Sequence, residues 1–114
     1  MDRKTIYHRF SRWVMLQPDA VAAVEDGRTV TYRELDLLAN AIMSKFYGKQ
    51  YQAIGLVMNH SIEMLAAMLA ILKSGAAYVP AEPSLPQKRI DYMMRTAETD
   101  FIITDDYCRN LPVT

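Results

Sequence analysis

The stretch AIGLVMNHSIEMLAAMLAILKSGAAYVP, residues 53–80, decides the fold of this chain. Its first part, residues 53–58, is a continuous apolar run, which is typical of a central parallel strand with both faces covered. Ser61 stands where it can cap a helix, and residues 62–72 are apolar on nearly every side. A helix of this kind must be buried. The stretch therefore predicts a buried strand that leads into a buried helix.

The same alternation continues towards the C-terminus. Residues 73–75 (KSG) predict the helix end, because they combine a cation near the negative end of the dipole with a glycine that can adopt a left-handed conformation. Residues 76–79 predict a second strand, and residues 80–86, with prolines at both ends, predict a stiff loop. A helix over 87–96 and a strand over 101–104 follow. The inner face of that helix is predicted to contain Ile90, Met93 and Met94.

This order of strand, helix, strand, helix and strand is the βαβαβ signature. It implies an α/β fold: a layered parallel sheet with right-handed crossovers, flanked by helices. After Asp105 we expect only a polar tail.

A small N-terminal helix and a hairpin precede this unit. Apolar residues at helical spacing predict a helix over 5–16, and residues 20–24 and 29–30 predict the two short strands of the hairpin. Residues 31–34 (TYRE) have the capping-box form, in which the Thr hydroxyl and the Glu carboxylate satisfy free amides at the start of a helix. That helix is predicted to stop near Gly48. Its buried stripe is predicted to contain Leu35, Leu38, Ala39, Ile42, Met43 and Phe46.

Composition restricts the possible functions. With 114 residues, 51% of them hydrophobic, the chain has the size and apolar content of one domain, 1–114. Its formal net charge is zero, so it lacks the basic surface that nucleic acids or anionic membranes require. The longest apolar run, 64–72, is about half the length of a membrane-spanning helix. The N-terminus lacks the apolar segment of a secretory signal, and the single cysteine, Cys108, forms no internal disulfide, so we expect a cytoplasmic protein.

Two ordered motifs and their surroundings resemble a known family. Residues 29–35 (TVTYREL) are similar to the first core motif of adenylation domains, and residues 72–80 (LKSGAAYVP) are similar to the second. The proline-rich segment 83–86 and the pair Arg89-Ile90 match the loop and the helix that follow in the family. The chain thus resembles the AMP-dependent synthetase/ligase superfamily, and most closely the N-terminal part of a nonribosomal peptide synthetase adenylation domain.

The resemblance implies that the chain is a partial subdomain of the adenylation-domain N-terminal lobe, with the remainder of that domain and a carrier protein as partners. The parent enzyme would use ATP and Mg²⁺ to activate an amino or other carboxylic acid as an acyl-adenylate, and would pass the acyl group to a thiol. Two features depart from the family: Glu82 replaces the common aspartate, and the loop 47–53 is short and has no acidic residue. We expect both to be surface changes.

The sequence lacks the groups that this chemistry needs. The four glycines stand singly, and no glycine-rich phosphate-binding loop, P-loop or GxGxxG is present. No cysteine and histidine spacing suits a metal ion. We therefore expect no catalytic, cofactor-binding or metal-binding residue in this chain, which would be a scaffold fragment that is inactive alone.

Several single residues have a functional and a structural interpretation, and the structural one is favoured for each. His60 follows a strand at the edge where ligands bind in open α/β sheets, but we expect a loop residue. Asp105 and Asp106 suggest a phosphoacceptor or Mg²⁺ pocket, but a solvated strand end is favoured. Lys73 suffices as a helix-terminal cation, and Cys108, in the polar tail, has no activating base beside it.

Four further side chains have simple structural interpretations. We expect His8 on the polar side of the first helix, and Trp13, Tyr32 and Tyr78 in the core. The main alternative function is a non-catalytic α/β module that docks a partner or forms a homo-oligomer through a surface exposed by truncation. A receiver-like signalling domain is a weaker alternative. The sequence leaves open which acid the parent activates.

Overall fold

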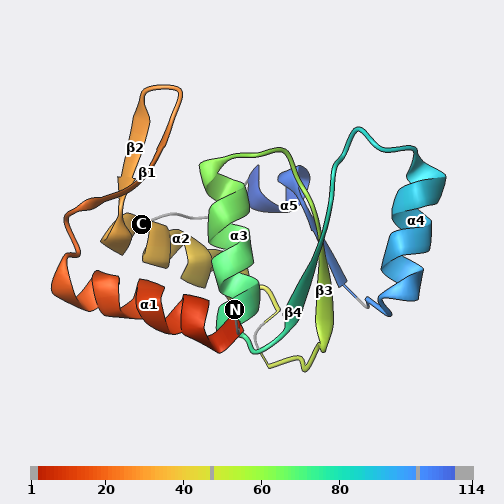
Figure 1. Ribbon diagram of the computed structural model, residues 1–114, viewed down its shortest axis with the longest axis horizontal. Helices are drawn as coiled ribbons and strands as arrows, with labels where there is room; N and C mark the ends of the chain where they lie inside the picture. The colour runs from red at the N-terminus through yellow and green to blue at the C-terminus, as the bar shows by residue number, and fades with distance from the viewer. Residues whose placement is uncertain (1–2, 47, 100, 110–114) are drawn as a thin grey trace.

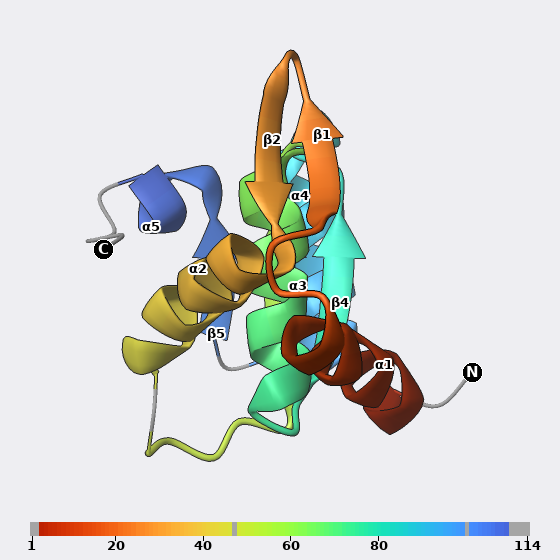
Figure 2. The same cartoon turned by 90° about the vertical axis from the view of Figure 1, so that its left-hand side faces the viewer.

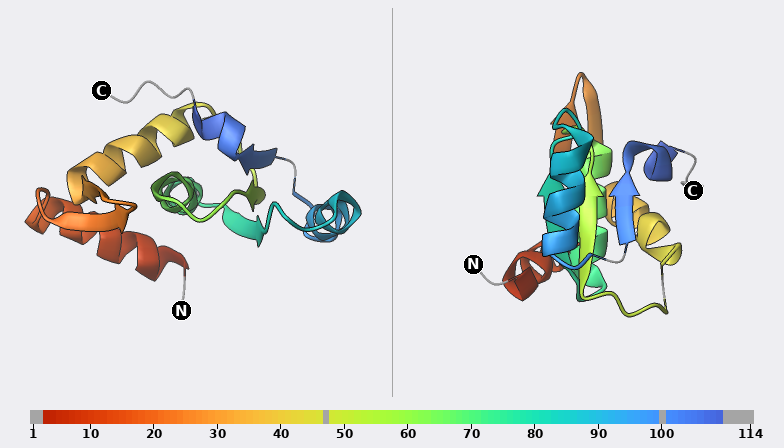
Figure 3. Two further views of the ribbon diagram at one scale, coloured as in Figure 1. Left: turned by 90° about the horizontal axis from the view of Figure 1, so that it is seen from above. Right: turned by 90° about the vertical axis from the view of Figure 1, so that its right-hand side faces the viewer.

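The computed structural model describes residues 3–46, 48–99 and 101–109. At its centre lies a three-stranded parallel sheet in the order β4-β3-β5 (Figure 1). The crossover helices lie on opposite faces of this sheet (Figure 3). The strands are β3 (Ala53–Val57), β4 (Ala77–Ala81) and β5 (Phe101–Thr104), and the crossover helices are α3 (Ile62–Lys73) and α4 (Gln87–Thr96). The predicted α/β fold with a βαβαβ parallel sheet is confirmed.

The N-terminal part is a helix, a hairpin and a second helix, as predicted. Helix α1 (Arg3–Leu16) precedes the antiparallel strands β1 (Val21–Glu25) and β2 (Arg28–Thr31), and α2 (Tyr32–Ser44) follows them (Figure 2). The Thr31 hydroxyl accepts a hydrogen bond from the Glu34 N–H at 3.1 Å, and the Glu34 carboxylate accepts one from the Thr31 N–H at 2.9 Å. The predicted capping box is therefore confirmed.

Helix α2 packs on α3 through its predicted stripe. The buried residues of the helix are Leu35, Leu38, Ala39 and Ile42, and Met43 is half-buried. The helix ends at Ser44, earlier than the stripe suggested, yet Phe46 beyond it is still buried. Gly48 has a φ of 89°, a left-handed conformation that glycine adopts without a steric penalty.

Both ends of α3 are closed by its own local sequence. At the start, the Ser61 hydroxyl accepts a hydrogen bond from the Met64 N–H at 3.0 Å. At the end, Gly75 has a φ of 91°, and the Ala76 N–H donates to the Ile71 carbonyl at 3.2 Å. These two features form the Schellman motif that terminates many helices. The predicted cap and stop of this helix are confirmed.

Each face of the sheet has its own apolar core. On one face, Ile54, Leu56 and Ile103 are fully buried in a cluster with α2 and α3. On the other face, Ile90 and Met94 of α4 form a smaller cluster. A strand buried on both faces needs apolar residues at every position, which explains the continuous apolar run of β3.

Gly55 lets α4 approach the sheet closely. A Cβ atom at this position would lie 2.5 Å from the Met94 Sδ and 3.1 Å from the Ile102 Cγ1. Both distances are shorter than ordinary van der Waals contact. A side chain at position 55 would therefore force the Met94 and Ile102 side chains on the α4 face to shift.

Strand β4 is longer than predicted. It continues through Pro80 to Ala81, so the loop that was expected to begin at Pro80 begins after Ala81. Proline is compatible with this position because β4 is an edge strand, where a missing N–H costs no ladder hydrogen bond.

The predicted polar tail is wrong as far as Arg109, and its remainder, 110–114, lies outside the described residues. Residues Asp105–Arg109 form a short helix, α5. Cys108, expected in an exposed tail, is only 6% exposed and belongs to the main core, against which Tyr107 also packs. The Tyr107 hydroxyl donates a hydrogen bond to the Ile42 carbonyl at 3.2 Å. Two side chains of this short helix, Tyr107 and Cys108, pack against the core. The polar residues around them give no amphipathic pattern from which the helix could be predicted.

The expectation that Trp13 lies in the core is also wrong. Its side chain is 50% exposed and stacks on the Tyr32 ring, with 5.8 Å between the ring centroids. Phe10 contacts the same tyrosine, which is half-buried between α1 and α2. Tyr78 is partly buried against the main core. The apolar stripe of α1 thus covers a tyrosine on the surface of α2 and leaves the tryptophan half in solvent.

Candidate functional site

The carboxyl edge of the parallel sheet is where a ligand site is expected. The chain passes from β3 to β4 on one side and then to β5 on the other side of β3, so the strand order reverses between β3 and β5. In open α/β sheets, ligands bind outside the carboxyl ends of the strands at such a switch point. The polar residues that follow the three strands are Asn59, His60, Glu82, Asp105 and Asp106.

Asn59 and Asp105 form hydrogen bonds with each other at the switch point. The Asp105 Oδ2 accepts two hydrogen bonds from Asn59, at 3.3 Å from the backbone N–H and at 3.1 Å from the Nδ2. These hydrogen bonds connect the end of β3 to the end of β5, although the two residues are far apart in sequence. Asp105 thus links the ends of two strands from the start of α5, whereas the sequence had predicted a solvated strand end.

His60 lies beside the Glu82 carboxylate, a neighbour that no sequence pattern predicted. Its Nε2 is 3.4 Å from the Glu82 Oε1, and both side chains are mostly exposed. Exposed ion pairs contribute little because water screens them and because long side chains must be ordered. His60 is therefore a loop residue, as expected, with a weak link to the end of β4.

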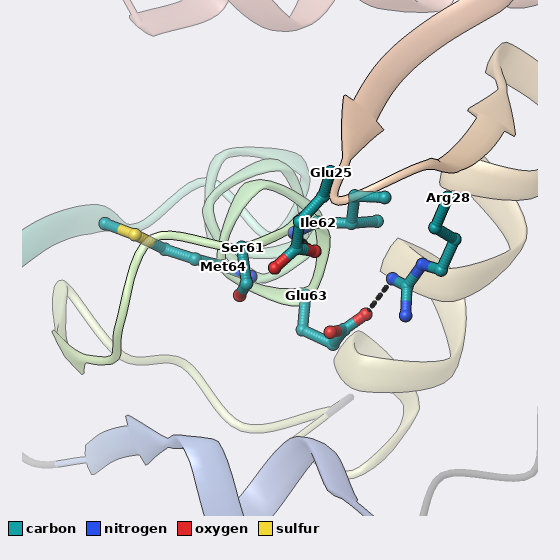
Figure 4. Close-up of polar contacts among 6 residues, drawn as sticks. All are labelled: Glu25, Arg28, Ser61, Ile62, Glu63 and Met64. Atoms are coloured by element: carbon teal, nitrogen blue, oxygen red, sulfur yellow. Dashed lines mark hydrogen bonds and ion pairs between the residues drawn. The ribbon is translucent and has the colours of Figure 1, made fainter.

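The hairpin and α3 meet in a second polar cluster (Figure 4). The Glu25 carboxylate accepts a hydrogen bond from the Ile62 N–H at 2.9 Å. Arg28, at the start of β2, forms an ion pair with Glu63 in the first turn of α3. Its hydrogen bond to Glu63 raises the pKa of the Arg28 guanidinium. The Ser61 hydroxyl accepts from the Met64 N–H, so two amides of the first turn of α3 are satisfied, one by the hairpin and one by the helix's own cap.

Glu25 was missed in the sequence because no local pattern relates a hairpin carboxylate to a helix that begins much later in the chain. The capping position at Ser61 was visible in the sequence, but the additional cap from the hairpin was not. The only available signal was a glutamate directly before the hairpin turn.

A shallow hollow lies between the hairpin and the start of α3. Its lining residues are Ala23, Val24, Glu25, His60, Ser61, Ile62 and Leu65. The helix N-terminus beside it would attract an anion, but the Glu25 carboxylate already occupies that position. The hollow is therefore lined largely by apolar side chains, and the Ile62 amide beside it is not free to bind an anion.

The other residues considered from the sequence have structural surroundings. The Lys73 Nζ donates to the Asn40 Oδ1 and lies 3.6 Å from the Asp36 Oδ1, so it links α3 to α2. Burial raises the pKa of the Cys108 thiol to about 11, which keeps it protonated and unreactive near neutral pH. His8 is exposed on α1.

Neither a cluster of metal-ligand side chains nor a membrane-spanning helix is found among the residues that the structure describes. Within residues 3–46, 48–99 and 101–109, no group of three or more His, Cys, Asp or Glu side chains is arranged to hold a metal ion. None of the helices described there is long and apolar enough to cross a bilayer. The described residues thus provide no cluster of three such side chains for the Mg²⁺ ion that the resemblance implies for a parent enzyme.

Comparison with known proteins gives consistent matches over nearly the whole chain. A family model described as AMP-binding enzyme matches residues 10–113. The dimodular nonribosomal peptide synthase of Bacillus subtilis is 36% identical over 106 residues, which are 90% of this chain and 4% of that protein. Bacitracin synthase 3 from Bacillus licheniformis is 34% identical over 106 residues, 90% of this chain and 2% of that protein. The chain therefore spans a small part of these relatives.

Solved structures share the same architecture. The nonribosomal peptide synthetase FmoA3 in its AMPPNP-bound form matches with a TM-score of 0.81 at 29% identity, over 94% of this chain and 12% of that one. The N-terminal subdomain of NpsA from Klebsiella oxytoca, in complex with 3-hydroxyanthranilyl-AMSN, matches with a TM-score of 0.82 at 24% identity, over 96% of this chain and 34% of that one. At 24% identity, the similarity to NpsA shows a shared fold and nothing further.

Proposed function

The chain belongs to the AMP-binding enzyme family, and from this membership we propose that it is an N-terminal scaffold part, 1–114, of an adenylate-forming ligase. The parent would activate an amino or other carboxylic acid with ATP and Mg²⁺ and transfer the acyl group to the thiol of a carrier protein. The match to AMPPNP-bound FmoA3 supports ATP as the nucleotide. The lone buried thiol of Cys108 supports a reducing compartment such as the cytoplasm.

The observation that carries the scaffold proposal is the structural role of both family motifs. In the first motif, Thr31 and Glu34 form the capping box that starts α2. In the second, Gly75 terminates α3 and directs the chain into β4. Each motif therefore fixes where a helix begins or ends. A catalytic constellation would instead direct several polar side chains at one common point.

The proposed chemistry requires phosphate-binding donors, and two candidate donors in this chain already have structural partners. An oxygen of the substrate carboxylate would attack the α-phosphorus of ATP, the new P–O bond would form, and pyrophosphate would leave. A thiolate would then attack the acyl carbon and release AMP. The first step needs amide or cationic donors around the phosphates. Here the Ile62 amide is capped by Glu25, and Lys73 is held between Asn40 and Asp36.

Pyrophosphate exchange tests this proposal directly. We expect the isolated chain to catalyse no ATP–pyrophosphate exchange with any acid of an amino-acid and aryl-acid panel. Residues 10–113 should, however, replace the matching segment of a complete nonribosomal peptide synthetase adenylation domain. That chimera should keep the exchange activity and the acid preference of the recipient. Exchange by the isolated chain would refute inactivity, and a folded chimera without exchange would refute the scaffold role.

A second candidate function is a non-catalytic module that self-associates. The observation that favours it is an apolar side chain, Ile102, exposed on an edge strand of the sheet. Open edges and exposed apolar residues are the features through which sheets pair with one another.

A further inference from the structure

Three consecutive residues after β3 connect this middle strand to its surroundings at the carboxyl edge of the sheet. Asn59 donates two hydrogen bonds to the Asp105 Oδ2 at the end of β5, at 3.3 Å from its N–H and at 3.1 Å from its Nδ2. The Nε2 of the next residue, His60, lies 3.4 Å from the Oε1 of Glu82, which follows β4. Ser61 then caps α3. The carboxyl end of β3 is thus linked by side chains to the ends of both neighbouring strands.

Of these two links, the one between Asn59 and Asp105 spans the switch point. Strands β3 and β5 are adjacent and parallel, with Val57 paired to Thr104 at their carboxyl ends. The chain reaches β4 through α3 on one face of the sheet and β5 through α4 on the other face (Figure 3). In doubly wound sheets, dinucleotides and flavin mononucleotide bind outside the strand ends at such a point. The separation of the β3 and β5 ends therefore shapes the place where a nucleotide would lie.

The link between Asn59 and Asp105 is suited to fixing geometry more than to adding stability. Both hydrogen bonds are exposed, and such bonds add little net free energy of folding because water offers the same groups other partners. The two residues are nevertheless 46 positions apart in sequence, so the link restrains two segments that the chain itself does not hold together. Both bonds converge on one carboxylate oxygen, so rotation of the loop relative to β5 breaks at least one of them.

We propose that Asn59 and Asp105 are positioning residues for the nucleotide in the adenylation step of the parent enzyme. This role rests on the proposed ligase function and deepens it. The hydrogen bonds hold the carboxyl ends of β3 and β5 at a fixed separation before the nucleotide arrives. Binding energy is then not consumed in ordering these two ends. Neither residue is assigned a contact with the nucleotide, because both act through the strand ends that they join.

The test uses the chimera in which residues 10–113 replace the matching segment of a complete adenylation domain. Initial rates of pyrophosphate exchange are measured with ATP and the acid varied separately. Asp105→Ala should raise the KM for ATP by roughly tenfold, less than the roughly hundredfold loss that a misplacement of about 1 Å can cause. The KM for the acid should stay unchanged. Destabilisation alone would instead lower the amount of active enzyme, and with it the apparent kcat, while both KM values stayed the same.

Two further variants separate the hydrogen bonds from the charge. Asp105→Asn keeps a side-chain oxygen with two lone pairs, which can accept both bonds, so the KM for ATP should stay near that of the unsubstituted chimera. Asn59→Ala removes only the Nδ2 donor and should raise the KM for ATP by about threefold. Combined with Asp105→Ala, it should add nothing further, because the two residues share one contact.

Glu82→Ala is the matched control. Glu82 is also an exposed carboxylate that is linked to the loop after β3, but its link runs to β4 and does not span the switch point. This variant should leave the KM for ATP unchanged. Thermal melting checks that every chimera is folded, and Asn59→Ala carries the same KM comparison where Asp105→Ala does not fold.

The possible outcomes distinguish the positioning role from the ligase function. An active chimera whose KM for ATP is unchanged by Asp105→Ala, or is raised as much by Glu82→Ala, would refute positioning by Asn59 and Asp105 and leave the ligase function intact. An equal rise with Asp105→Asn would assign the effect to the charge and would refute it as well. A folded chimera that shows no exchange before any substitution would refute the scaffold role, and the positioning role with it.

Discussion

The Glu25 carboxylate accepts a hydrogen bond from the Ile62 N–H at 2.9 Å, across 37 positions of sequence. Glu25 ends the first hairpin strand, and Ile62 begins the most deeply buried helix of the fold. The contact therefore fixes the hairpin to the core and at the same time satisfies an amide that helix geometry leaves without an intrahelical partner.

Loss of the Glu25 carboxylate should destabilise the chain. We expect Glu25→Ala to lower the free energy of unfolding by about 0.5–2 kcal/mol, the usual range for a lost N-terminal cap. Glu25→Gln keeps a side-chain oxygen that can accept the bond but removes the negative charge, so it should cost less. Urea denaturation followed by circular dichroism measures both values. Equal stability of wild type and Glu25→Ala would show that the cap contributes nothing.

A side chain at Gly55 should be poorly tolerated because of Met94. Gly55→Ala places a methyl group 2.5 Å from the present position of the Met94 Sδ, and overpacking of this kind costs about 1–3 kcal/mol. Met94→Ala alone should also destabilise, because it leaves a cavity. In the double variant the new methyl group occupies part of that cavity, so the combined loss in chemical denaturation should be smaller than the sum of the two single losses. Additive losses would contradict direct contact.

Gly75 should be required for its backbone conformation and not for space. Its φ is 91°, and a Cβ there would meet no heavy atom within 4 Å. Gly75→Ala should therefore cost about 1 kcal/mol from left-handed strain alone. Gly75→Asn is the matched comparison, because asparagine tolerates this conformation better than alanine does. Thermal melts should rank glycine above asparagine and asparagine above alanine. An alanine variant as stable as wild type would contradict the strain argument.

Stability should fall at alkaline pH because the buried Cys108 thiol and the partly buried Tyr107 phenol hold their protons more tightly in the folded state. Burial raises the pKa of Cys108 from 9.0 to about 11 and that of Tyr107 from 10.0 to about 12. Above pH 9.0 the unfolded chain loses the thiol proton while the folded chain keeps it, so the unfolded state is favoured. The Cys108 contribution is fully present below pH 9.0 and is lost as pH rises through about 11.

The matched variants separate the two contributions. Urea midpoints measured across this range should decline for the wild type, and Cys108→Ala should remove the decline that begins at pH 9.0. Tyr107→Phe should remove the part that begins at pH 10.0. A wild-type profile that is flat up to pH 11 would contradict the burial of the thiol as the cause.

Most of the sheet could be predicted from sequence because its elements are defined by local patterns. The bounds of α4 and β5 agree with the predicted 87–96 and 101–104. The limits of α3 were readable from Ser61 and Gly75, since capping and left-handed termination are properties of a few adjacent residues. The apolar run of β3 indicated burial on both faces before any neighbour was known.

The errors concern contacts between distant parts of the chain. Cys108 was assigned to an exposed tail, because no local pattern shows that one helical turn docks on α2 and α3. Trp13 was assigned to the core on its periodicity, but its neighbour across the interface is the rim residue Tyr32. Pro80 was taken as a loop start, although an edge strand accepts it.

For the candidate site too, some features could be predicted from sequence and others depended on the tertiary structure. The sequence by itself determined the fold class, the two motifs and the absence of the family's phosphate-binding loop, because each is a matter of residues adjacent in the chain. Only the tertiary structure decided that Asp105 accepts hydrogen bonds from Asn59 and that Glu25 caps Ile62. The physical reason is that periodicity and capping act over a few residues, whereas hydrogen-bond partners and exposed edges depend on which distant segments the folded core brings together.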